Sequence, residues 1–121
     1  MSREQLAKLA LRHVEAFRDG DVPTLMADYA EDAKIITSGG VVDGYAAIEA
    51  MFSTNLASDF FSPTKSKTTF DPPVVVDDEV AVVYWKTVNE THRIAGGIDT
   101  LVVRDGKIAL HTASGEPVPL D

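Results

Sequence analysis

The sequence contains no cysteine, which excludes disulfide bonds, thiolate nucleophiles and sulfur-ligated metal sites. It also has no apolar run near the roughly 20 residues that a transmembrane helix needs. Its start, Met1–Gln5, is polar and charged where a secretory signal would turn apolar. We therefore expect a cytoplasmic protein without a membrane partner.

Positive charge is scarce as well, with 11 lysines and arginines against 19 aspartates and glutamates and a formal net charge of −8. This charge repels nucleic-acid phosphates, and no basic cluster opposes it, so no nucleic-acid partner is expected. The histidines His13, His92 and His111 lie far apart, without metal-ligand spacing. Gly39–Gly40 is not followed by the lysine of a phosphate-binding loop. We expect neither a metal nor a cofactor.

The composition is that of a globular protein, with 45% hydrophobic and 25% charged residues, and no linker or repeat divides residues 1–121. We therefore expect a single domain. Apolar residues recur at helical spacing over 2–19, and Gly20 ends that pattern. Asp21 begins a second helix, whose inward stripe is expected to include Tyr29.

A third helix is expected to open at Asp43–Gly44, and a short strand at Lys34–Thr37 to pair with Val41–Val42. Later in the chain the apolar periodicity shifts towards two. Four further strands are predicted near residues 68–76, 80–89, 92–103 and 107–114. Helices followed by strands with short connections predict an α+β domain with an antiparallel meander. Two prolines predict that the tail after Ser114 is extended and unpaired.

Four local sequences stand out at the junctions of these elements: Ala16–Asp21, Tyr29–Ala33, Gly44–Ile48 and Asp105–Ile108. In this order they resemble the SnoaL-like and ketosteroid-isomerase-like families of the nuclear-transport-factor-2-like superfamily. The resemblance covers nearly the whole chain. It implies a conical roll, in which three N-terminal helices pack on a strongly curved, mainly antiparallel sheet and enclose a pocket. It also implies a homodimer formed through the sheets.

Asp99 is the strongest candidate for a catalytic residue. It lies in the apolar run 95–103, where an ionised carboxylate is costly unless it is paired or protonated. The resemblance places it where a ketosteroid isomerase has a neutral acid that donates a hydrogen bond to the substrate oxyanion. The alternative is that Asp99 points out of the sheet and pairs with a basic residue on a neighbouring strand.

His13 is the second catalytic candidate, because it lies on the apolar stripe of the first helix. The resemblance places it where a ketosteroid isomerase has its oxyanion-hole tyrosine. A histidine there can hydrogen-bond Asp99 or exchange a proton near neutral pH. The alternative is a core histidine whose nitrogens are satisfied locally.

Further residues are candidates for contact with a ligand, because their helical or strand phase turns them inward or their hydroxyl can bind a ligand oxygen. They are Phe17, Tyr29, Thr37, Phe52, Val82, Tyr84 and His111. The alternative for each is ordinary core packing. For His111 the strand phase is ambiguous, because the opposite face of its strand, with Ile108 and Leu110, is the more apolar one.

The superfamily includes isomerases, cyclases, hydrolases and members that only bind, so the resemblance leaves the reaction open. Thr37 falls where a ketosteroid isomerase has its general-base aspartate, and Gly97 stands where the Asp-Arg-Asp relay of limonene-type epoxide hydrolases has arginine. Both departures argue against those two mechanisms. We expect a small hydrophobic ligand and a cofactor-free acid–base enzyme of isomerase, cyclase or hydrolase type. The alternatives are a non-catalytic binding domain and a dimeric interaction domain with Trp85 and Thr87 at the contact between subunits.

Overall fold

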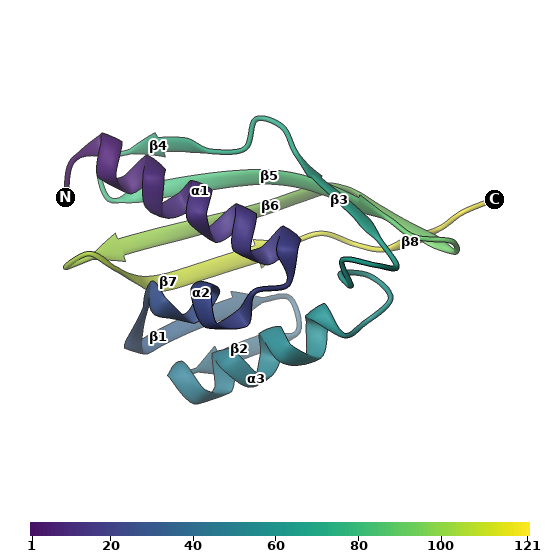
Figure 1. Ribbon diagram of the computed structural model, residues 1–121, viewed down its shortest axis with the longest axis horizontal. Helices are drawn as coiled ribbons and strands as arrows, with labels where there is room; N and C mark the ends of the chain where they lie inside the picture. Colours follow the sequence, from purple (N-terminus) through teal and green to yellow (C-terminus); the bar gives the residue numbers. More distant parts are fainter.

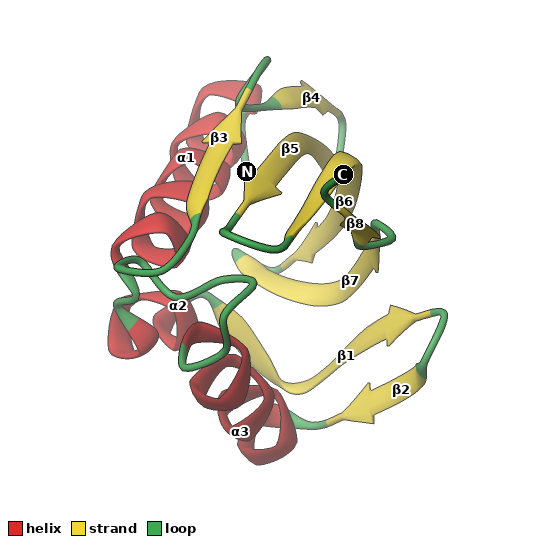
Figure 2. Cartoon of the chain, turned by 90° about the vertical axis from the view of Figure 1, so that its right-hand side faces the viewer, coloured by secondary structure: helices red, strands yellow, loops and turns green.

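The computed structural model describes residues 1–121 and places all three helices on one side of a single curved, open sheet (Figures 1 and 2). The elements are α1 (Arg3–Asp19), α2 (Val22–Ala27), β1 (Tyr29–Thr37), β2 (Gly40–Asp43), α3 (Tyr45–Leu56), β3 (Lys67–Phe70), β4 (Val75–Asp77), β5 (Val80–Val88), β6 (His92–Arg104), β7 (Lys107–Ser114) and β8 (Val118–Pro119). The strand order is β2-β1-β7-β6-β5-β3, with β4 also paired to β5 and β8 to β6. The predicted α+β class with three N-terminal helices on a strongly curved sheet is confirmed.

The first helix follows from local sequence. Ser2 and Gln5 form a reciprocal capping box at its start, which satisfies backbone amides that have no partner within the helix. Gly20 ends it in the left-handed conformation, with φ 73°, and its amide donates to the carbonyls of Ala16 and Phe17. The inward stripe of α1 is buried, and it carries His13 to the concave side of the sheet.

The second helix is shorter than predicted, and Tyr29 begins β1 instead of completing the apolar stripe of α2. The cause lies at Asp28, where the chain is held by tertiary contacts. Its carboxylate accepts two hydrogen bonds from Arg12, at 2.8 and 2.7 Å, and its carbonyl oxygen accepts from the amide of Ile108 at 2.7 Å. These contacts attach the chain to β7 directly before Tyr29, so the helix ends there.

The sheet departs from a simple meander in three places. β1 pairs in parallel with β7, so the sheet is mixed, although its other pairs are antiparallel. The predicted strand 68–76 is divided into β3 and β4 around Asp71–Pro73, because proline has no amide hydrogen for the ladder. The tail is not unpaired, since Val118 and Pro119 pair with the first residues of β6.

The main core lies between the helices and the concave face of the sheet. It consists of 16 buried residues, the largest of which come from α1, α2, α3 and the inward faces of β1, β6 and β7. Burial of these side chains fixes the three helices against the strands that carry the polar groups described below. None of the helices combines the length and the apolar character required to cross a membrane.

Candidate functional site

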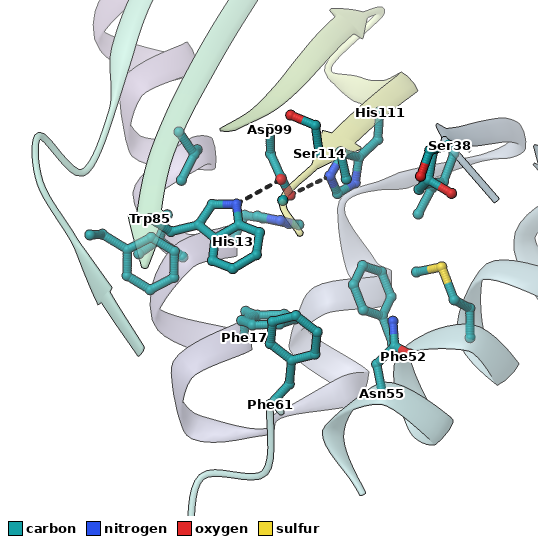
Figure 3. Close-up of a pocket in the computed structure, with 18 residues that line it drawn as sticks. His13, Phe17, Ser38, Phe52, Asn55, Phe61, Trp85, Asp99, His111 and Ser114 are labelled. Atoms are coloured by element: carbon teal, nitrogen blue, oxygen red, sulfur yellow. Dashed lines mark hydrogen bonds and ion pairs between the residues drawn. The ribbon is translucent and has the colours of Figure 1, made fainter. Parts of the chain in front are cut away.

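A cavity of about 270 Å³ lies between α1, α3 and the concave face of the sheet (Figure 3). Its walls are mostly aromatic and aliphatic, with Phe17, Phe52 and Phe61 among the lining residues. Two side chains at its rim, Ser38 and Ser114, are exposed and polar. Apolar side chains thus form most of the wall, and polar side chains lie both at the rim and on the part of the wall described next.

Four side chains form a chain of hydrogen bonds along one wall of this cavity. The indole Nε1 of Trp85 donates to Oδ1 of Asp99 at 2.8 Å, and Nε2 of His111 lies 2.7 Å from Oδ2 of Asp99. The other ring nitrogen of His111, Nδ1, lies 2.8 Å from the hydroxyl of Tyr29. Figure 3 shows Asp99 held between Trp85 and His111. We call this set the Asp99 chain.

The protonation states in the Asp99 chain follow from its partners. Burial raises the pKa of Tyr29 well above its usual value, with further contributions from the charges of Asp99 and Asp28, so this phenol is neutral. A neutral phenol donates to Nδ1 of His111, which leaves the ring proton on Nε2 to be donated to Asp99. The carboxylate therefore accepts on both oxygens, the arrangement that stabilises an ionised acid in apolar surroundings.

This arrangement also decides what His111 can do. Both of its ring nitrogens are occupied, one by Asp99 and one by Tyr29. A histidine that activates a serine needs one free nitrogen facing the hydroxyl, so His111 cannot activate Ser38 or Ser114 at the rim. The group in this chain that lines the cavity and can still accept a proton is the carboxylate of Asp99.

Trp85 is positioned by two glycines. A Cβ atom on Gly97, which pairs with Trp85 across β5 and β6, would lie 2.5 Å from Cζ2 of the indole and closer still to Cε2 and Cδ2. A Cβ atom on Gly115 would lie 3.1 Å from Cη2. Phe61 packs edge-on against the indole, with ring centroids 5.6 Å apart. The ring therefore lies flat on the backbone of β6, and its Nε1 reaches Asp99 two residues along that strand.

His13 lies beside this chain without joining it. Its ring is buried, its centroid is 5.5 Å from that of His111, and its Nδ1 is the one buried side-chain polar atom without a hydrogen-bond partner. The predicted contact with Asp99 is made by His111 instead. Burial lowers the pKa of His13 to about 3, repulsion from His111 adds to this, and the charge of Asp99 opposes it. His13 is therefore a neutral imidazole at neutral pH.

This buried histidine predicts acid sensitivity. The pKa of an unperturbed histidine is 6.5, and that of His13 in the fold is about 3, so the unfolded chain binds more protons between those two values. Stability should therefore fall as the pH drops below 6.5, by about 1.4 kcal/mol per pH unit. Urea denaturation at pH 6.5 and pH 5 should show a loss of about 2 kcal/mol that His13→Phe largely removes. The half-buried His92 provides the control, and an equal effect of His92→Gln would contradict the assignment.

Only some of the other predicted ligand contacts line the cavity. Phe17, Thr37 and Phe52 line the cavity together with His13, Asp99 and His111, whereas Tyr29 lies behind His111 and does not line it. The ambiguity at His111 is resolved by an irregularity in the β6–β7 pairing between Val102 and Val103. Because of this shift in register, both Ile108 and His111 are buried on the inward face.

In β5 the predicted inward face is wrong. Val82 and Tyr84, expected on the cavity wall, are not among its lining residues, and Tyr84 is 37% exposed. Their neighbours Val83 and Trp85 line the cavity instead. The sequence is apolar at every position over 80–83, so alternation carries no signal there, and a phase error of one residue exchanges the two faces. Trp85 was missed as a site residue for the same reason.

No group of three histidine, aspartate or glutamate side chains converges in a way that could hold a metal ion. The polar groups of the cavity are those of proton transfer and hydrogen bonding.

Comparison with known proteins identifies the family. Residues 10–111 match the SnoaL-like domain, and no protein of curated function matches the sequence. An NTF2-like protein of unknown function from Mesorhizobium loti has a similar structure, with a TM-score of 0.80 and 18% identity over 94% of this chain and 93% of that one. A protein from Kribbella flavida described as a "putative ketosteroid isomerase" has a TM-score of 0.78 and 19% identity, over 94% of this chain and 79% of that one. AclR from Streptomyces galilaeus, described as a "putative hydroxylase", has a TM-score of 0.76 and 12% identity, over 95% of this chain and 91% of that one. These likenesses establish that the chain has the fold of the NTF2-like proteins, and the match over residues 10–111 shows that it belongs to the SnoaL-like domain family.

Proposed function

We propose that the cavity binds a small hydrophobic carbonyl compound, and that Asp99 removes a proton from the carbon next to the carbonyl group. The observation that carries this proposal is the Asp99 chain, which holds a carboxylate at the wall of an otherwise apolar cavity. A carboxylate held at a fixed position on the cavity wall can take a proton from a carbon atom of a bound ligand. The activity is that of a cofactor-free isomerase or cyclase.

The proposed step is a simple proton transfer. Asp99 takes the proton, the C–H electron pair becomes the new C=C bond, and the carbonyl oxygen gains the negative charge of an enolate. In an isomerase the same proton then returns to a different carbon, and the carboxylate is regenerated. His111 keeps its hydrogen bond to Asp99 throughout and orients the carboxylate. The hydroxyl of Tyr29 fixes the His111 ring through its hydrogen bond to Nδ1.

His13 supplies the second part of the proposed site, a donor for the enolate oxygen. Its Nδ1 is covered and has no partner. An unpaired lone pair costs less than an unpaired N–H, so the proton is better placed on Nε2, the nitrogen that can face a ligand. A neutral imidazole can donate that hydrogen bond without carrying a charge into the cavity. His13 lines the cavity, as this role requires.

The size of the cavity indicates which carbonyl compounds fit. At about 270 Å³ it lies just below the range of roughly 300–1,000 Å³ that is typical of pockets for drug-sized ligands. One or two fused rings suit this volume better than a four-ring steroid. Thr37 offers no second base, because a hydroxyl is too weak, and its Oγ1 accepts a hydrogen bond from the amide of Gly39 at 3.1 Å.

The test is proton exchange at carbon. We expect the protein to accelerate deuterium incorporation from D₂O next to the carbonyl group of 1-indanone, 2-tetralone or acetophenone, followed by NMR. The same ketones should raise the thermal unfolding temperature. If the ketones bind but their protons do not exchange, the protein binds ligands in this pocket without catalysing a reaction. Absence of both effects for all three ketones would contradict the proposed ligand class.

We also propose a homodimer, formed through the outer face of the sheet. Tyr84 and Ile98 are opposite each other on this face and are 37% and 42% exposed, so together they offer an apolar patch for a contact between subunits. The contact predicted for Trp85 and Thr87 is wrong, because both face inward. Sedimentation at micromolar concentration should give a dimer that Ile98→Lys converts to a monomer. A monomeric wild-type protein would refute this proposal.

A further inference from the structure

A second hollow lies on the outside of the molecule, directly beside the cavity. This outer groove, of about 650 Å³, runs between α1 and β3, and the loop over 61–66 forms its end. Four residues line both hollows, namely Val14, Phe17, Phe61 and Phe70. The cavity and the outer groove are therefore separated by a partition only one side chain thick.

The partition is made mainly of aromatic rings on a fixed backbone. Phe17, Phe61 and Phe70 are each half-buried, and the Phe61 ring contacts Phe17 edge-on with centroids 5.5 Å apart. The loop itself is tied down, since the amides of Ser62 and Ser66 donate to carbonyls four residues earlier, at 2.9 and 3.0 Å. An opening between the two hollows would therefore come from movement of these side chains, because the loop backbone is held by its own hydrogen bonds. Figure 3 shows Phe61 beside Phe17 at the edge of the cavity.

The charge of the outer groove differs from that of the whole protein. Although the chain has a net charge of −8, the groove is lined by the cations Arg18 and Lys67 and one acid, Glu15. Arg18 is 3.7 Å from Asp19 in a solvent-exposed pair, whereas Lys67 forms no ion pair. Lys67 is therefore free to bind an anion at this position.

We propose that the outer groove is a second subsite, which takes the carboxylate end of an elongated ligand whose apolar end lies in the cavity. The ligand passes the partition beside Phe61, and Lys67 and Arg18 bind its carboxylate. This inference rests on the proposed function, because it requires that the cavity binds an apolar group. It adds to that function a substrate class, apolar ring compounds that carry an acidic side chain.

The test compares two probes of the same length by calorimetry, 6-phenylhexanoate and 6-phenylhexanamide, with acetophenone as the probe for the cavity alone. We expect the acid to bind more tightly than the amide, by about 2- to 5-fold as for an exposed ion pair. Lys67→Ala should remove this preference, and high salt should weaken it. Lys86→Ala removes an exposed lysine from the outer face of β5 and should leave the preference intact.

Equal affinities for the acid and the amide in the wild-type protein would overturn the second subsite, as would equal effects of Lys67→Ala and Lys86→Ala. If acetophenone still binds in that case, the proposed function survives without the subsite. If neither acetophenone nor the longer probes bind, both proposals fail together. The three probes therefore separate failure of the subsite from failure of the cavity.

Discussion

Asp99→Asn is expected to lower the rate of ketone deuterium exchange by about 10²- to 10⁴-fold, the usual contribution of a general base. The amide oxygen of asparagine can still accept from Trp85, and its NH₂ group can donate to His111, whose ring proton then moves to Nδ1 and is donated to the Tyr29 oxygen. The variant keeps the geometry of the chain and loses the group that takes the proton. Binding of acetophenone and the unfolding temperature should change little.

The matched control is Asp32→Asn, which removes an exposed carboxylate from β1 at no cost to the cavity. It carries the same charge change, so a general electrostatic effect would appear in both variants. If Asp99→Asn and Asp32→Asn exchange protons equally fast, the base lies elsewhere. An Asp99→Asn protein that no longer binds ketones would instead make Asp99 a binding residue.

Gly97→Ala is expected to cost about 3 kcal/mol of unfolding free energy, from overpacking and from the lost hydrogen bond to a charged group. The added methyl group would overlap the indole of Trp85, which has Phe61 and Gly115 on its other sides and no space to move into. Displacement of the ring breaks its hydrogen bond to Asp99, so ketone exchange should fall as well. Chemical denaturation and the emission of the single tryptophan measure both effects.

Gly96→Ala is the control for this change, because a Cβ atom there would meet nothing within 4 Å. The two substitutions are adjacent on β6, and both replace glycine by alanine, so they share any effect on the conformational entropy of the unfolded chain. Equal stabilities of the two variants would show that Trp85 is not held against the backbone of β6. A blue or red shift of the emission in the Gly97→Ala variant alone would support the close contact.

The sequence predicts the fold well because its signals are local. The Ser2 cap, the Gly20 stop and the apolar stripe of α1 are each determined within a few residues, and the observed helix follows them. The end of α2 could not be predicted, since it depends on contacts of Asp28 with Arg12 and with the backbone of β7. The parallel pairing of β1 with β7 was equally hidden, because no local pattern specifies a partner so distant in the chain.

Within the candidate site, residues on helices were predicted better than residues on strands. The stripe of α1 leads directly to His13 and Phe17, because a helix has a wide apolar face and small phase errors do little harm. A strand has only two faces, and uniformly apolar β5 carries no phase signal, so Tyr84 was placed inward and Trp85 outward. Gly97 is the sequence signal that could have indicated the inward position of Trp85, because a large ring opposite a glycine can lie flat on the sheet.

The parallel pairing of β1 with β7 also bears on the order in which the protein folds. Tyr29 lies opposite Ile108 in this pair, so the two strands meet only after most of the chain is available. Contacts between residues so distant in sequence slow folding, because the intervening chain must be closed into a loop first. During synthesis, α1, α2 and the β1–β2 hairpin leave the ribosome long before His111 does. We therefore expect the Asp99 chain, which joins Tyr29 to His111, to be among the last parts of the molecule to form.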